Sequence, residues 1–229
     1  AGAQLGIIGI LYAYTIGEAV TLLLLLPRML KLMEMRFDQS ILKEALRFGS
    51  PLVIGSLSGM LLNTSDRYLL SIIKDSENVA LYDLGYRIAG FLNMVLILPF
   101  NLALPPIASK KYMEPGDKRY FSKIMTYLSF VLVWGGLTLS IFSHELLSTF
   151  ALNESYWPAA SVVPFLVLSY IFIGMRYVAV LGLFLTKSTK HVAILVISAT
   201  IVSILLNLML IPQLGYLGAG VSSTASFFF

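Results

Sequence analysis

Cysteine is absent from the chain, and charged side chains are scarce. Without cysteine there is no disulfide framework, no thiol nucleophile and no cysteine-ligated metal. Only 12% of the 229 residues are charged, against roughly 25% in a soluble domain. Because so few charges cannot cover a water-soluble surface, we expect lipid to be the solvent for much of the chain.

Long apolar stretches fill the sequence instead, with 58% hydrophobic residues and a mean hydropathy of +0.85. A transmembrane helix needs about 20 apolar residues, and no stretch alternates with the period of two of a barrel strand. We therefore predict an all-α polytopic membrane helix bundle with six full spans and a seventh, truncated span that begins near residue 216. The six predicted spans are 5–27, 50–73, 82–107, 124–143, 158–185 and 191–211.

Lysine and arginine are concentrated in alternate gaps between the spans. Twelve of the 16 lie in gaps 28–49, 108–123 and 186–190, whereas the other gaps hold only Lys74. The positive-inside rule assigns the basic gaps to the cytoplasm. The net charge of +4 does not indicate nucleic-acid binding, since the basic residues flank membrane spans rather than forming one patch. Within the first basic gap, the alternation of residues 37–48 indicates an interfacial helix that leads into the next span.

Seven polar side chains inside or at the edge of spans are the candidates for function. Burying arginine at the centre of a membrane helix costs roughly 2.5–3.5 kcal/mol, so the presence of each arginine in a span requires an explanation. The candidates for substrate binding in a cavity are Arg176, Arg67, Arg87 and Asn63, and those for ion coupling or charge balance are Glu18, Asp66 and Asp83.

Two interpretations of these residues stay open. The arginines line a water-filled cavity and bind an anion through their planar fork, or they form ion pairs within the protein and extend towards the interface. Asp83 and Arg87 are four residues apart and are expected to pair on one helix. Arg176 has no acid within one turn, and we expect it to contact the anionic group of a ligand.

Enzyme chemistry has no support in the sequence. His144 and His191 lie near span ends without a partner at metal-ligand spacing, and no phosphate-cradling loop is present. We therefore expect a protein that is not an enzyme and that has no metal site and no cofactor.

Several stretches together resemble one transporter family. They are residues 48–52 (FGSPL), 66–70 (DRYLL), 79–89 (VALYDLGYRIA), 187–190 (KSTK) and 206–220 (LNLMLIPQLGYLGAG). These resemble the Wzx-like polysaccharide and O-antigen flippases of the multidrug/oligosaccharidyl-lipid/polysaccharide exporter superfamily.

The resemblance implies a two-bundle transporter of 12 to 14 helices. It would make residues 1–30 the last helix of the amino-terminal bundle, 31–49 a cytoplasmic linker with the interfacial helix, and 50–229 most of the carboxy-terminal bundle. The chain would then be a fragment that needs the missing amino-terminal bundle. An L-G-x-x-G pattern at residues 5–9 and again at 214–218 agrees with parallel repeats of the kind found in transporters.

The same resemblance implies the substrate and location: a glycan linked to undecaprenyl pyrophosphate, moved across the cytoplasmic membrane of a prokaryote by alternating access. Two alternatives remain. A multidrug or organic-cation exporter of the same superfamily would need acidic cavity residues, and a membrane glycan polymerase or ligase would need a large outer loop.

The predicted orientation can be tested directly because the chain has no cysteine. We expect an Asn153→Cys variant, but not a Lys111→Cys variant, to react with a membrane-impermeant maleimide added to intact cells. Labelling of Lys111→Cys but not of Asn153→Cys would show that the orientation is the opposite of the predicted one.

Overall fold

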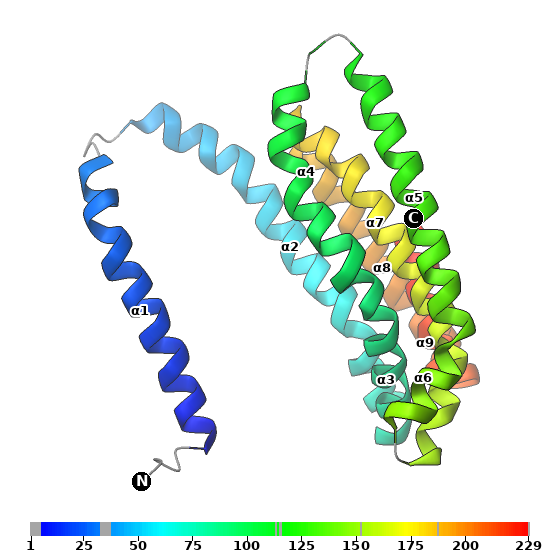
Figure 1. Cartoon of the computed structure of the whole chain (residues 1–229). Helices are drawn as coiled ribbons and strands as arrows, with labels where there is room; N and C mark the ends of the chain where they lie inside the picture. The colour runs from blue at the N-terminus through cyan, green and yellow to red at the C-terminus, as the bar shows by residue number, and fades with distance from the viewer. Residues whose placement is uncertain are drawn as a thin grey trace. The chain divides into compact units, whose positions relative to one another are not determined.

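The computed structural model describes residues 6–32, 38–112, 114, 116–151, 153–186 and 188–228. Outside this part lie residues 33–37 of the predicted linker, Lys187 of the family-like stretch, and Leu5, the first residue of the first predicted repeat. All secondary structure in the described part is helical (Figure 1). The elements are α1 (Gly6–Leu32), α2 (Gln39–Ile73), α3 (Ser76–Leu92), a π-helical turn (Asn93–Ile97), α4 (Leu98–Lys111), α5 (Asp117–Ile141), α6 (Ser143–Phe150), a 3-10 segment (Glu154–Val162), α7 (Val163–Leu185), α8 (Thr189–Leu214) and α9 (Tyr216–Phe228).

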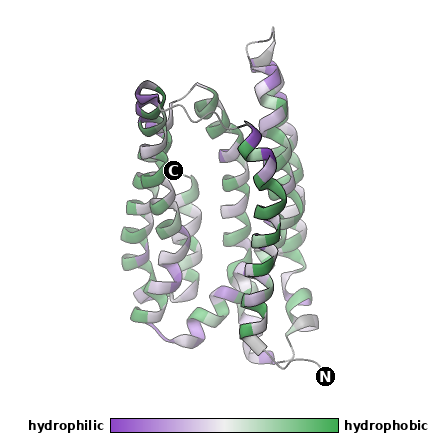
Figure 2. Cartoon of the chain, turned by 90° about the vertical axis from the view of Figure 1, so that its left-hand side faces the viewer, coloured by the Kyte–Doolittle hydropathy of each residue, from purple (hydrophilic) through white to green (hydrophobic). Residues whose placement is uncertain are grey.

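Six helical segments of the described chain are long and apolar enough to cross a membrane. This confirms the predicted all-α polytopic bundle with six spans, and the chain is a multi-pass membrane protein. Figure 2 shows hydrophobic residues along the length of the long helices. Hydroxyl groups inside these helices are largely satisfied locally, as where Thr15 donates to the carbonyl of Leu11 at 2.9 Å, which keeps polar atoms away from lipid.

The chain divides into two compact units, Ala1–Glu44 and Ala45–Phe229. Helix α1 belongs to the first unit, and nearly all of its described side chains are exposed. The described part of the expected interfacial helix forms the beginning of α2, which continues through Pro51 as one helix from Gln39 to Ile73.

Helix α7 forms the centre of the second unit, where it packs against α3, α5, α8 and α9. Its inward face is apolar and buried, and includes Leu166, Val167 and Ile171. Close approach at this centre depends on glycine. A Cβ atom on Gly136 of α5 would lie 2.6 Å from Cγ1 of Val167 and 3.0 Å from Cδ1 of Ile171. Small residues let membrane helices approach closely and gain van der Waals contact.

Two positions with positive φ shape the turns of this unit. Gly116, at φ 86°, precedes α5, and Gly215, at φ 57°, joins α8 to α9. At Gly215 a Cβ atom would also lie 2.5 Å from Oδ1 of Asn78, the same oxygen that accepts a hydrogen bond from the backbone N–H of Tyr216 at 3.2 Å. The α8–α9 turn is thereby fastened to the start of α3.

Replacing Gly136 with alanine should destabilise the bundle by about 1–3 kcal/mol, because the added methyl group overpacks the α5–α7 contact. Gly182→Ala on α7 is the matched control, since no atom lies within 4 Å of its Cβ position and alanine favours a helix over glycine by up to about 1 kcal/mol. Equilibrium unfolding in mixed detergent micelles measures both. Equal stability of the two variants would contradict the packing role of Gly136.

Candidate functional site

Asp66 on α2 is buried in the second unit, with 3% of its surface exposed. Its carboxylate accepts hydrogen bonds from the hydroxyl of Tyr82 on α3 at 2.7 Å, from Oγ of Ser223 on α9 at 2.6 Å, and from Nδ2 of Asn207 on α8 at 2.6 Å. Four helices therefore meet at one carboxyl group. We call these four residues the Asp66 cluster.

Three oxygens of the Asp66 cluster contact one another but share too few hydrogens. Oδ2 of Asp66 accepts from both Tyr82 and Ser223, and the two hydroxyl oxygens also lie 2.9 Å apart. Each hydroxyl group carries one hydrogen, and both are used on the carboxylate. A proton on Asp66 would supply the hydrogen that the third contact lacks, whereas a small cation would be coordinated by the lone pairs of these oxygens.

Asn207 adds a second unmet acceptor. The residue is fully buried, and its Oδ1 accepts no hydrogen bond within the described part of the chain. Reversing the amide would bring this oxygen against the carboxylate of Asp66, so the orientation with Nδ2 towards Asp66 is the favourable one. A buried acceptor without a donor costs about 1–3 kcal/mol, a cost that a hydrogen-bond donor or a cation bound beside Asn207 would relieve.

The Asp66 cluster has no ion-pair partner among the described residues, where the ion pairs found are Arg67–Asp83 and Lys111–Glu114. The described residues also contain no group of three or more His, Cys, Asp or Glu side chains that could hold a metal ion. The donors of the cluster are oxygens from one carboxylate, one amide and two hydroxyls. This set suits a proton or a hard monovalent cation better than a transition metal.

Arg67 follows Asp66 along α2 but points to a different side of the helix, where it is partly exposed. Its Nε forms an ion pair with Asp83 of α3, and its NH1 donates to the carbonyl of Asn63 at 3.0 Å. The guanidinium carbon lies 4.3 Å from the ring centre of Tyr86, a cation–π distance. Arg67 is thus neutralised and held in place.

The predicted pairing of Asp83 with Arg87 is therefore wrong. A spacing of four residues can predict only partners on the same helix, whereas the α2–α3 hairpin brings Arg67 of α2 against Asp83. Asp75 caps the start of α3 by accepting from the backbone N–H of Asn78 at 2.8 Å, and this bond lowers the pKa of its carboxyl group. The capped turn fixes the register in which residues 66 and 67 face residues 82 and 83.

Arg87 lies one turn beyond Asp83, is exposed, and has no hydrogen bond or ion pair with the described residues. Asn63 is also exposed, and its Nδ2 donates to the carbonyl of Gly59 at 2.7 Å. Together Asn63, Arg67, Asp83 and Arg87 form a polar face on α2 and α3, within otherwise apolar spans. The structure brings three of these predicted residues into direct contact and leaves Arg87 free.

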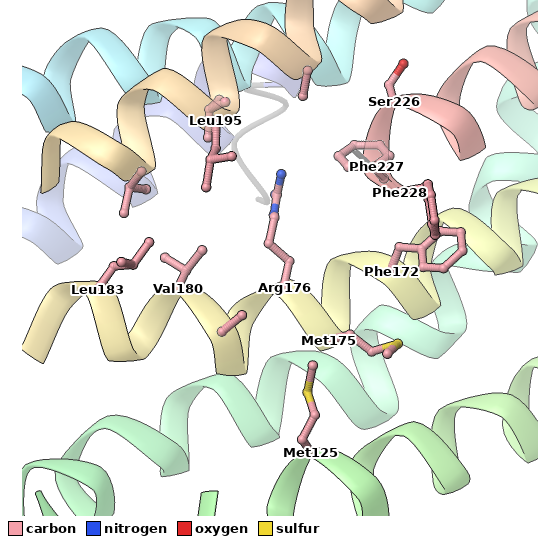
Figure 3. Close-up of a pocket in the computed structure, with 14 residues that line it drawn as sticks. Met125, Phe172, Met175, Arg176, Val180, Leu183, Leu195, Ser226, Phe227 and Phe228 are labelled. Atoms are coloured by element: carbon pink, nitrogen blue, oxygen red, sulfur yellow. The ribbon is translucent and has the colours of Figure 1, made fainter. Parts of the chain in front are cut away.

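Arg176 lies in a different place, on α7, and lines a pocket of about 370 Å³ between α5, α7, α8 and α9. Its side chain extends from α7 towards α8 and α9 (Figure 3), and its guanidinium carbon lies 5.5 Å from the ring centre of Phe227. The remaining lining is mostly apolar, and no acid pairs with Arg176 in the described chain. Glu18 is exposed on α1, in the other unit.

Sequence reasoning identified Asp66 but missed its three partners, Tyr82, Asn207 and Ser223. A signal for α8 existed: Thr200, Ser203 and Asn207 are spaced by three and four residues and therefore share one face of a highly apolar helix.

Part of the chain is similar to a known protein family. The model of a family described as "Polysaccharide biosynthesis protein" matches residues 3–111, which include α1 to α4 and hence Asp66 and the polar face. No curated protein and no solved structure matches the chain. The match supports a membrane transporter related to polysaccharide biosynthesis.

Proposed function

We propose that this chain is part of a flippase that moves a lipid-pyrophosphate-linked oligosaccharide across the cytoplasmic membrane for polysaccharide biosynthesis. The observation that carries the proposal is the polar face of α2 and α3, where Asn63, Arg67, Asp83 and Arg87 interrupt apolar spans. Ionisable groups inside spans generally face protein or a water-filled pathway rather than lipid. The family match over the same helices supports polysaccharide as the cargo class.

The distribution of charge favours an anionic substrate over a cationic drug. Asp83 is already paired with Arg67, and Asp66 is enclosed by hydrogen-bond donors. By contrast, Arg87 and Arg176 have no acid partner in the described chain. A pyrophosphate group matches the guanidinium fork, whereas an organic cation would find no unpaired acid on this face.

A polymerase or ligase is disfavoured by the outer segment between α5 and α7. It consists of the short helix α6 (Ser143–Phe150) and the 3-10 segment Glu154–Val162. This leaves no large outer domain there to carry catalytic acids.

The Asp66 cluster supplies a coupling site in this proposal. It lacks one hydrogen for its three oxygen contacts and contains an unpaired amide oxygen. A proton on Asp66 would supply the missing hydrogen, and a bound Na⁺ would use the unpaired amide oxygen as a ligand. Release of either ion would leave a buried carboxylate without a counter-charge. An ion gradient can drive transport only if the two conformations bind the ion differently.

Arginine substitutions test the anion-binding role. In the full-length protein, Arg176→Ala and Arg87→Ala should each reduce glycan export at least tenfold while protein abundance stays unchanged. The lysine variants should recover part of the activity, because an ammonium keeps the charge but loses the bidentate geometry.

Lys74→Ala, which removes an exposed charge outside the polar face, is the control and should export normally. Wild-type export by both alanine variants would remove these arginines from the mechanism, and loss of export in step with protein abundance would indicate a structural role instead.

Substitution within the Asp66 cluster tests coupling. Proteoliposomes that contain the full-length protein should transport faster when a proton or Na⁺ gradient is imposed, with each gradient applied separately. Asp66→Asn should abolish this acceleration, because the neutral amide cannot exchange a charge.

Ser223→Ala should weaken the acceleration, and Ser222→Ala is its matched control. Ser222 is equally buried but donates only to Gly218 of its own helix, at 2.9 Å. A full response to both gradients in Asp66→Asn would exclude this residue from coupling.

A further inference from the structure

We infer that Tyr82 is a positioning residue that makes the availability of Arg67 depend on whether the Asp66 cluster holds a cation. The inference rests on the proposed function, because it gives Arg67 a role in binding the anionic group of the substrate. It adds a physical connection between the coupling site and the substrate face.

The register of the α2–α3 hairpin provides that connection. Asp66 and Arg67 are consecutive on α2, and their partners Tyr82 and Asp83 are consecutive on α3. Successive residues of a helix point about 100° apart. The Asp66–Tyr82 hydrogen bond therefore faces the buried interior, and the Arg67–Asp83 ion pair faces the exposed edge. Both interactions join the same short segments of α2 and α3.

Displacement of α3 therefore affects both interactions together. Tyr82 is fully buried, and its hydroxyl contacts both Asp66 and Ser223, at 2.7 and 2.9 Å. Its ring lies 5.7 Å from the guanidinium carbon of Arg67, next to the closer ring of Tyr86. A shift of Tyr82 relative to Asp66 would thus move Asp83 and the aromatic surface on which Arg67 rests.

The charge of the Asp66 cluster determines the direction of the effect. With a cation bound, the cluster is neutral, α3 stays against α2, and Arg67 remains occupied by Asp83. Without it, the carboxylate keeps its three hydrogen-bond donors but has no counter-charge in a buried site, which is costly. Hydration of that carboxylate separates α3 from α2 at Tyr82 and releases Arg67 for a phosphate oxygen.

The charged and titratable groups around Asp66 are few. Tyr82 faces it from α3, the uncharged Asn207 and Ser223 face it from α8 and α9, and Arg67 is its neighbour on α2. Arg67 remains charged at any accessible pH. If anion binding depends on pH or Na⁺ and this dependence requires Tyr82, the dependence therefore arises from the Asp66 cluster acting on Arg67 through Tyr82.

Linkage requires the effect to be reciprocal: if cation binding weakens anion binding, anion binding must weaken cation binding by the same factor. Such an arrangement favours exchange of the two ligands over their joint transport. Tyr82 would thus contribute to the direction of coupling without touching the substrate.

The test uses farnesyl pyrophosphate as the probe and the full-length protein in nanodiscs. The dissociation constant is measured by calorimetry while pH and Na⁺ concentration are varied separately. For the wild type we expect binding to weaken at least about fivefold as the cluster fills, the lower end of typical coupling between sites. Tyr82→Phe keeps the ring but removes the hydroxyl, and should bind the probe with an affinity that no longer varies.

Tyr86→Phe is the matched control, because its ring lies against Arg67 but it makes no contact with Asp66. It should keep the full dependence on the ion. An equal dependence in Tyr82→Phe and the wild type would overturn the inference.

A second measurement separates this inference from the proposed function. Cysteines introduced as Met60→Cys on α2 and Met94→Cys next to α3, both at exposed positions, carry spin labels in a chain that has no cysteine. The distance between the labels should change with pH or Na⁺ in the wild-type background and stay constant with Tyr82→Phe. A constant distance in both backgrounds would refute the inference. An ion-dependent distance that requires Tyr82, without any binding of the probe, would support it and contradict the proposed substrate.

Discussion

Burial of the Asp66 carboxyl group is the constraint on which the second unit depends. A carboxyl group in a low-dielectric interior is tolerated only when donors surround it, and α3, α8 and α9 each supply one. The three helices are thereby fixed around α2 at one depth. Apolar packing alone discriminates poorly between helix arrangements in a membrane, because lipid is as apolar as the side chains. A polar cluster with specific geometry favours one helix arrangement over others, which apolar side chains such as leucine and valine cannot do.

The three arginines of the spans differ in the contacts that hold them. Arg67, next to Asp66, is held by Asp83, the carbonyl of Asn63 and the ring of Tyr86. Arg87, farther along α3, has no such support and is exposed. Two arginines on one face can therefore play different parts: one can be released by a movement of α3, and the other is free in the present conformation. Arg176 has apolar neighbours and belongs to a separate pocket.

The fold could be predicted from the sequence because its determinants are local. The length of an apolar run determines whether it spans a membrane, so the six spans are recovered among the described residues. The site could be predicted only in part, because its contacts join distant residues. Asp66 and Ser223 are 157 residues apart, and Asp66 and Asn207 are 141 apart. The pairing of Asp83 with Arg87 failed for the same reason, since spacing on one helix says nothing about a competing partner on another.

The positions of the hydroxyl residues show how such a cluster can coexist with close packing. Ser222 and Ser226 donate to carbonyls of their own helix, whereas Ser223 turns to Asp66. Small residues on α9 allow it to lie close to α8, and a Cβ atom on Gly218 would lie 2.5 Å from the carbonyl oxygen of Leu210. A bulkier α9 would stand farther from α8 and could not bring a hydroxyl group and an amide to the same carboxylate. Close packing of α9 against α8 therefore places Ser223 within reach of Asp66, so a conformational change that moves α9 would also alter the hydrogen bonds of the Asp66 cluster.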